Sequence, residues 1–424
     1  MTISIMQDNY KSIVKNLMIY TVLIVVSIDC MHILSLIPIG AKILNAFKIW
    51  NLALLPIYIL SHKKNIQTKD VFLCILFIPF FYIYVGELNL INFVLKVISR
   101  FVPIFSFLLL DDRSKLKVVK NWVYLYCVTL VPAVIIHILK FGLSIDFPVN
   151  TVTNFMGKSY DTHFFIYYYY KFNYIRFCGL YDEPGVIGTF SYLFLIFMDN
   201  HLSRFQKFVL WITGLFSLSF FFILSIPLII LLHLIKRKQY FKLASLTFLG
   251  IIFASIAPTI VESALKSTNS SSVYQDLIFH TLKSRFDIDE KSGSVGSIKT
   301  NRLNSERYTM DDFLKDDKLT IVMGNFATSD SKSFGELSEG GLGLEIYLFQ
   351  YGILFFLYTF LMSFLINILP QKNGVIYFFT ATLLTLLCLY QRPFLYKIEF
   401  VVIFYVGALL FRIRGNSDKV NAIT

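Results

Sequence analysis

Long apolar runs separated by short polar stretches dominate this chain of 424 residues. A helix needs about 20 apolar residues to cross the roughly 30 Å of hydrocarbon in a bilayer. The pattern therefore predicts an all-α integral membrane protein with about twelve transmembrane helices. The expected spans lie near residues 14–37, 42–60, 71–86, 90–110, 119–140, 184–199, 206–219, 221–236, 240–260, 342–369, 374–391 and 397–412.

Composition and charge agree with this class. Hydrophobic residues make up 56% of the chain and charged residues only 16%, whereas soluble domains carry about 25% charged residues. With the N-terminus in the cytoplasm, the short basic loops all fall on the cytoplasmic side, as the positive-inside rule requires. Both termini are therefore expected in the cytoplasm, and the net charge of +12 reflects orientation rather than nucleic-acid binding.

Two long polar segments lie outside the cytoplasm in this topology, and long loops commonly carry the chemistry. The second is expected to contain short helices, one over Val273 to Phe286 and one from about Ser305 to Lys315. The chain then divides into helices 1–5 (1–140), a first outer loop (141–183), helices 6–9 (184–260), a large outer loop (261–341), and helices 10–12 with a cytoplasmic tail (342–424).

The segment from Arg176 to Gly188 is the most informative polar stretch. A guanidinium is a planar fork that matches phosphate oxygens, and Pro184 is favoured at the first position of a helix. The free N–H groups of that helix are then expected beside the arginine as an anion cradle. Asp182 and Glu183 either cap the helix, or orient the arginine and remove a proton from a sugar hydroxyl.

A second acidic helix start precedes the tenth span at Ser338-Glu339-Gly340. Glu339 is the preferred general base, and its alternative role is a helix cap. His280 and His163 are the other candidate bases in the outer loops, although a lone loop histidine is usually only exposed. The run from Tyr167 to Tyr170 is interpreted as an interfacial aromatic belt, and a platform for sugar stacking is the alternative.

Further outer arginines suggest a polyanionic ligand. Arg302 and Arg307 lie in the large outer loop, although Arg302 also has Glu306 as a possible surface partner. Arg392 lies between two apolar helices, where an unpaired charge is costly, so a role or a partner such as Glu399 is expected. No spacing of histidine and cysteine residues predicts a zinc site, so no metal is expected.

The segment with Arg176, Gly179, Glu183-Pro184 and Gly188 resembles the outer-loop motif of Wzy-type O-antigen polymerases and the related O-antigen ligases. The order of parts is also similar, with a large periplasmic loop late in the chain and a polar motif at the next helix. The matching stretches here are Asn301 to Arg307, Leu319 to Asn325, Ser338 to Gly340 and Gln350 to Leu354. Where the ligases commonly carry a His-Asn pair, this chain has Glu339-Gly340, which favours a polymerase.

The resemblance implies a glycosyltransferase of the membrane C type in lipopolysaccharide biosynthesis at the bacterial inner membrane. It would join repeat units carried on undecaprenyl diphosphate at the periplasmic face, inverting the anomeric centre without metal or cofactor. Expected partners are the lipid-linked repeat units and membrane lipid, with room for a chain-length-regulating co-polymerase. The expected roles are diphosphate binding by Arg176 and Arg302, supported by Arg307 and Arg392, and proton removal by Glu339 or Glu183, with Asp182 and His280 secondary.

Two alternatives stay open from the sequence. An O-antigen ligase would transfer the finished glycan to a lipid A core acceptor. A lipid-linked oligosaccharide flippase would line its central cavity with intramembrane charges, for which Asp29, Lys96 and Arg100 are available. Against the flippase stands the outer loop of about 80 residues, which is long for a connector.

Overall fold

The computed structural model describes most of the N-terminal half of the chain and selected parts of the C-terminal half. The described residues are 2–31, 38–84, 89–153, 159–170, 176–181, 184–219, 286–288, 295–298, 310–324, 343–369 and 397–414, with parts of 222–230 and 382–389 and residue 395.

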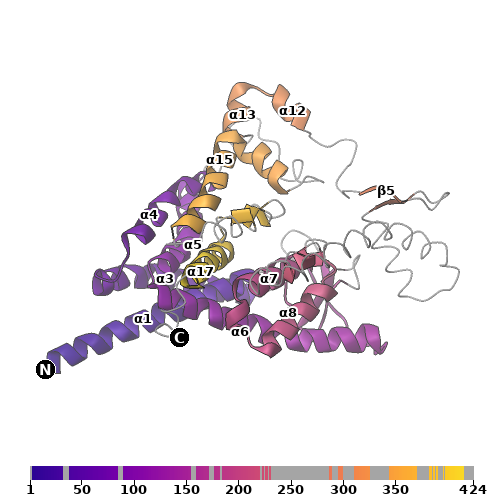
Figure 1. The fold of residues 1–424 in the computed structure, drawn as a ribbon, viewed down its shortest axis with the longest axis horizontal. Helices are drawn as coiled ribbons and strands as arrows, with labels where there is room; N and C mark the ends of the chain where they lie inside the picture. Colours follow the sequence, from indigo (N-terminus) through magenta and orange to yellow (C-terminus); the bar gives the residue numbers. More distant parts are fainter. Residues whose placement is uncertain are drawn as a thin grey trace.

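The described protein is a bundle of helices with a small antiparallel sheet beside it (Figure 1). The N-terminal helices are α1 (Thr2–Cys30), α3 (Pro38–His62), α4 (Thr68–Leu76), the 3-10 helix η1 (Ile78–Tyr84), α5 (Leu90–Leu108), and α6 (Asp112–His137), which continues into the π-helical turn η2 (Ile138–Gly142). The remaining helices are α7 (Pro184–Phe197), η3 (Asp199–His201), α8 (Arg204–Phe216), α12 (Met310–Lys315), α13 (Lys318–Met323), α15 (Gly343–Ile368) and α17 (Ile398–Arg414).

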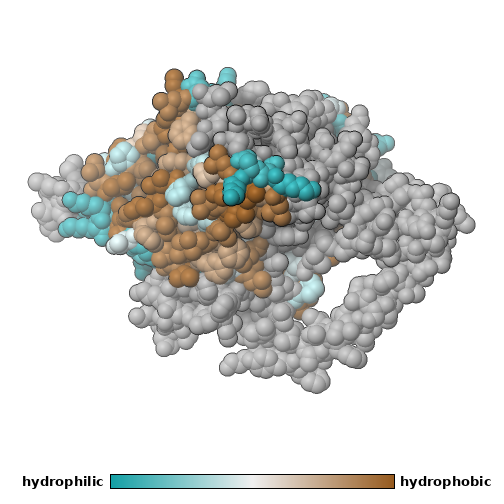
Figure 2. Space-filling view, turned by 90° about the horizontal axis from the view of Figure 1, so that it is seen from above, coloured by the Kyte–Doolittle hydropathy of each residue, from teal (hydrophilic) through white to brown (hydrophobic). Residues whose placement is uncertain are grey.

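Five described helices are long and apolar enough to cross a membrane. They are Asp8–Cys30, Gly40–His62, Leu90–Leu108, Asp112–Gly142 and Tyr347–Ile368. Pro184–Phe197 and Ile398–Leu410 are shorter apolar helices. Figure 2 shows a broad hydrophobic surface over the described helices, with hydrophilic residues at its margins. These features are consistent with a multi-pass membrane protein, whereas the expected number of twelve spans is not confirmed.

Two expected spans are interrupted. The span near 71–86 is broken: α4 ends at Leu76 and the chain tightens into η1. Pro79 explains the break, because it has no N–H to donate and its ring clashes with the preceding turn. The span near 342–369 is α15, which bends at Gly352, where φ is 79° and ψ is 172°.

Helix α17 lies at the centre of the bundle, because it contacts α1, α5, α6, α7 and α15. Its residues from Ile398 to Leu410 are nearly all buried. A helix that is apolar on all sides is buried either in a protein core or in a membrane, and here neighbouring helices cover it. Helix α17 therefore links the N-terminal helices to α15.

The first outer loop contains a three-stranded antiparallel sheet that the sequence analysis did not predict. Its strands are β1 (Asn150–Thr153), β2 (Ser159–His163) and β3 (Tyr167–Tyr170), in that order. Tyr167 and Tyr168 are buried, so the first half of the tyrosine run belongs to the core, and the interpretation as an interfacial belt is wrong for these two residues.

The large outer loop is described only in part. It contains a short hairpin of β4 (Phe286–Ile288) and β5 (Val295–Ile298). The helix expected from about Ser305 to Lys315 is confirmed at its end, since α12 finishes at Lys315. The residues 273–285 of the other expected helix lie outside the described residues.

Candidate functional site

Arg176 lies at the C-terminal end of α8. Its Nε donates a hydrogen bond to the carbonyl oxygen of Ser217 at 3.3 Å, and the next residue, Phe177, donates its backbone N–H to the carbonyl of Phe216 at 3.0 Å. The last carbonyls of a helix lack partners within the helix and carry partial negative charge, so a guanidinium there is stabilising. Arg176 therefore caps α8, while its expected contact with a diphosphate stays a prediction.

Two glycines of the same motif have packing roles. Gly179 has a φ of 55°, and its carbonyl accepts a hydrogen bond from the N–H of Tyr168 at 2.9 Å, which joins this segment to the sheet. A Cβ atom at Gly188 would lie 2.4 Å from the Cβ of Ser219. Only glycine allows α7 to approach the turn after α8 so closely.

The other predicted site residues are not placed by the structure. Asp182, Glu183, His280, Arg302, Arg307, Glu339 and Arg392 all lie outside the described residues. Their roles, and their distances from Arg176, stay predictions.

His163 is described, and it is buried rather than exposed. Its Nε2 accepts a hydrogen bond from Lys140 Nζ at 2.6 Å, so its Nδ1 donates to the carbonyl of Pro148 at 2.8 Å. Burial lowers the pKa of His163, and the charge of Lys140 lowers it further. These contacts hold a neutral imidazole in place at the base of the sheet, which is a structural role.

A polar cavity of about 220 Å³ lies between α1, α3, α5 and α17. Asp29 accepts a hydrogen bond from Lys48 Nζ at 3.3 Å and another from an Arg100 Nη at 3.0 Å. The sequence analysis singled out Asp29 and Arg100 as intramembrane charges, but it missed Lys48. The polar cavity is lined by Asp29, Ala41, Leu44, Asn45, Lys48, Arg100, Lys397 and Glu399.

Three charged residues of the polar cavity come from different parts of their helices. Asp29 lies at the end of α1, Arg100 lies within α5, and Glu399 lies in the first turn of α17. A carboxylate in a first turn is favoured by the helix dipole. Glu399 is only 5% exposed, and its Oε2 has no hydrogen-bond partner among the described residues.

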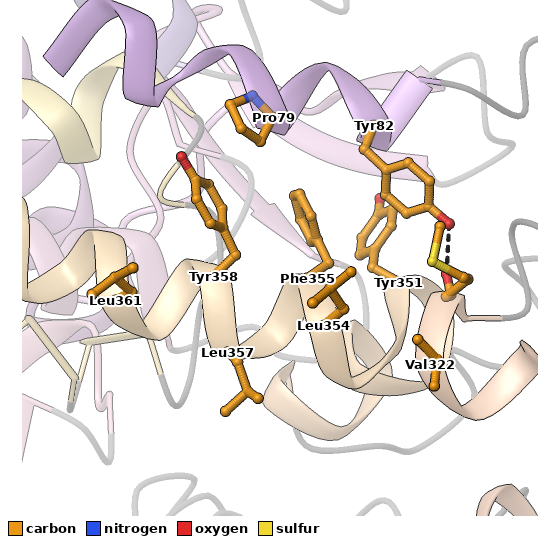
Figure 3. Close-up of a pocket in the computed structure, with 10 residues that line it drawn as sticks. Pro79, Tyr82, Val322, Tyr351, Leu354, Phe355, Leu357, Tyr358 and Leu361 are labelled. Carbon is orange, nitrogen blue, oxygen red and sulfur yellow. Dashed lines mark hydrogen bonds between the residues drawn. The ribbon is translucent and has the colours of Figure 1, made fainter. Parts of the chain in front are cut away.

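An apolar groove of about 610 Å³ lies between η1, α13 and α15 (Figure 3). Figure 3 shows Tyr82 entering from η1 and Tyr358 from α15. The Tyr82 hydroxyl donates to the carbonyl of Met323 at 2.7 Å, and the Tyr358 hydroxyl donates to the carbonyl of Leu76. The groove is lined by Pro79, Tyr82, Val322, Met323, Tyr351, Leu354, Phe355, Leu357, Tyr358 and Leu361.

The backbones of two segments meet at one end of this groove, and each has a glycine at the point of contact. Gly324 ends α13 with a φ of 84°, and a Cβ atom there would lie 2.3 Å from the carbonyl oxygen of Gln350. A Cβ atom at Gly352 would lie 2.3 Å from the carbonyl oxygen of Val322. The two backbones therefore touch. The described part of the stretch Leu319 to Asn325, which ends at Gly324, meets the stretch Gln350 to Leu354 here, and both stretches carried the family resemblance.

Helix η1 lines the apolar groove and also contacts α5, which contributes Arg100 to the polar cavity. Phe81 packs against Phe101 of α5 with ring centroids 4.7 Å apart. Tyr82 lines the groove, whereas Tyr84 packs against Phe101, the neighbour of Arg100 in α5, with ring centroids 6.4 Å apart. One short helix thus contacts both the groove and the helix that carries Arg100.

No group of three or more histidine, cysteine, aspartate and glutamate residues that could hold a metal ion occurs in the described part of the chain. Comparisons of this chain with known protein families, with curated proteins and with solved structures found no match.

Proposed function

We propose that this protein is a surface-polysaccharide polymerase, as the resemblance to Wzy-type O-antigen polymerases implies. It transfers a glycan from undecaprenyl diphosphate to a sugar hydroxyl of a second lipid-linked repeat unit at the periplasmic face. The observation that carries the proposal is the apolar groove beside the crossing of Gly324 and Gly352. The two sequence stretches that resemble the family form one wall of a groove suited to a long hydrocarbon chain.

The groove suits an isoprenoid chain because aliphatic and aromatic side chains line it, and its polar tyrosine hydroxyls are occupied by backbone carbonyls. Apolar lining with a few fixed polar groups is typical of ligand sites. Helix α15 forms the long wall and begins at Gly343. Since Glu339 precedes Gly343 by four residues in the chain, a lipid bound along α15 would direct its headgroup toward the predicted base.

The chemistry follows from the charges that change during transfer. Glu339 accepts the proton of the acceptor hydroxyl while the oxygen of that hydroxyl forms a bond to the anomeric carbon of the donor. The bond from that carbon to the diphosphate oxygen breaks, and undecaprenyl diphosphate leaves with the electron pair. Cationic groups stabilise this developing charge, and Arg176 and Arg302 are the proposed groups. A single displacement inverts the anomeric centre.

The test is elongation by the purified protein in nanodiscs supplied with undecaprenyl-diphosphate-linked repeat units. A ladder of products spaced by one repeat is expected, with and without a chelator. Leu357→Trp fills the apolar groove and is expected to slow ladder formation, whereas Leu60→Trp, on the exposed face of α3, is the matched control. A ladder unaffected by Leu357→Trp would remove the groove from the proposal.

Two site variants test the assignments of charge. Glu339→Gln is expected to abolish elongation while lipid binding persists. Arg176→Ala also removes a cap of α8, so thermal stability is measured beside activity. Full elongation by Arg176→Ala would end its diphosphate role, and full elongation by Glu339→Gln would end its role as base.

A flippase is the second candidate, favoured by the intramembrane charges of Asp29, Lys48 and Arg100. Discontinuous helices and buried charges near the membrane centre are features of transporters, and α15 bends at Gly352. Movement of lipid-linked oligosaccharide across liposomes without elongation would establish this function in place of the polymerase.

A further inference from the structure

The polar cavity holds an unbalanced set of charges. Three cationic side chains, Lys48, Arg100 and Lys397, face two carboxylates, Asp29 and Glu399. With all five ionised, the set carries one excess positive charge. An excess charge within a membrane bundle is expensive unless a counter-charge approaches it.

The cations also retain hydrogen-bonding capacity toward the cavity. Arg100 has five N–H donors and Lys48 has three. Asp29 takes one bond from each, which leaves further donors of both side chains for a ligand. The planar fork of an arginine matches the oxygens of a phosphate group in a bidentate arrangement.

Glu399 supplies the complementary group, an acceptor. Its Oε2 is buried without a hydrogen-bond partner among the described residues, in a side chain that is 95% buried and lines the cavity. A buried polar atom left without a partner destabilises the folded state. A ligand with an O–H group would satisfy it.

We propose that the polar cavity is a phosphate subsite, in which Lys48, Arg100 and Lys397 bind phosphate oxygens and Glu399 accepts a hydrogen bond from a ligand hydroxyl. The hydroxyl belongs either to a protonated phosphate or to the sugar next to it. The phosphate comes either from the lipid diphosphate, in which case the inference rests on the proposed function, or from free pyrophosphate. Lys48 of α3, Arg100 of α5 and Lys397, which precedes α17, would then share the ligand charge that the sequence analysis gave to outer-loop arginines.

The test is calorimetric binding to the full chain in nanodiscs of zwitterionic lipid. The probes are inorganic pyrophosphate, farnesyl diphosphate and farnesol. Farnesyl diphosphate binding more tightly than both others indicates a lipid diphosphate, whereas equal binding of pyrophosphate and farnesyl diphosphate indicates free phosphate. Equal binding of farnesol and farnesyl diphosphate would overturn the phosphate subsite.

Two cavity variants are expected to change the affinity for pyrophosphate in opposite directions, which separates an effect on the site from a loss of fold. Lys397→Gln removes one cation and is expected to weaken pyrophosphate binding about tenfold. Glu399→Gln removes a negative charge but keeps an acceptor oxygen, so it is expected to tighten pyrophosphate binding. Lys63→Gln, at an exposed lysine after α3, is the control and is expected to change nothing. A damaged fold cannot produce the tighter binding.

Unchanged affinity in both cavity variants would overturn the proposal, because the charge of the cavity would then not contribute to binding. Elongation is measured separately, so the two proposals can fail independently. A protein that binds pyrophosphate in the expected way but forms no ladder would keep the subsite and lose the polymerase.

Discussion

Two buried ion clusters contact α17 at different points along its length. They differ in whether the charged groups of the cluster satisfy one another's hydrogen bonds. In the closed cluster, Lys115 Nζ donates to Asp70 at 2.7 Å and to the Tyr405 hydroxyl at 3.1 Å, and that hydroxyl donates to the second oxygen of Asp70 at 2.6 Å. Lys115 also lies over the Tyr405 ring, 4.4 Å from its centroid. Asp70 and Lys115 are almost completely buried.

The open cluster is the set of charges around the polar cavity. Its ion pairs are longer, at 3.0 and 3.3 Å, Arg100 is 28% exposed, and Glu399 leaves an oxygen without a partner among the described residues. A cluster whose groups satisfy one another has no need of a ligand and serves to join helices. A cluster with unmatched charge and an empty volume beside it has the features of a binding site.

The largest expected effect is the loss of a partner in the closed cluster. Lys115→Met leaves the Asp70 carboxylate buried without its counter-charge, so the free energy of unfolding is expected to fall by about 3–5 kcal/mol. Chemical unfolding in detergent micelles measures this. Adding Asp70→Asn should recover most of the loss, and a single variant as stable as the parent would contradict the assignment.

A smaller effect is expected at the tyrosine of the same cluster. Tyr405→Phe keeps the ring but removes the hydroxyl that links Lys115 to Asp70, so the free energy of unfolding should fall by about 1–3 kcal/mol. The same unfolding measurement applies, with pyrophosphate titration beside it. Because the closed cluster is structural, the affinity for pyrophosphate should stay unchanged. A weaker affinity would contradict the assignment of anion binding to the open cluster alone.

In the open cluster, Asp29→Asn should affect binding more than stability. The variant raises the excess positive charge, but asparagine keeps an oxygen that accepts a hydrogen bond from Lys48 or Arg100, so the expected loss of stability is about 1 kcal/mol. Pyrophosphate should raise the melting temperature more in this variant than in the parent, since binding to the folded state stabilises it. An equal shift in both proteins would count against an anion site.

The smallest effect concerns pH at Asp111, which caps α6 three residues before Ser114. Burial raises the pKa of Asp111, but hydrogen bonds from Lys15 and Ser114 outweigh it and hold the pKa below its usual value. The folded state therefore gains stability above the unfolded pKa of about 3.9, and loses it as the pH falls through the folded pKa.

Asp111→Asn should flatten this dependence while changing stability at neutral pH by less than about 1 kcal/mol, because asparagine is an equally good N-cap. Unfolding of both proteins between pH 5 and 3 measures the difference. An unchanged slope in the variant would show that other carboxylates control the acid response.

Much of the membrane architecture could be predicted from the sequence, because it depends on local patterns. The apolar runs of α1, α3, α5 and α6 indicate helices near their observed positions, since hydrophobicity and length are properties of each segment alone. The break before η1 was missed even though Pro79 marks it. The β-sheet was missed as well, because it depends on pairing between strands rather than on any one strand.

The candidate site depended on contacts that no local pattern contains. Arg100 bonds to Asp29 across 71 residues of chain, and Tyr405 bonds to Asp70 across 335. The sequence by itself determined that the chain forms long apolar helices, consistent with a multi-pass membrane protein, with isolated charges inside them, because hydrophobicity and length are properties of each segment separately. Only the tertiary structure decided which charges complete one another and which surround a cavity, because that depends on how four separate helices pack.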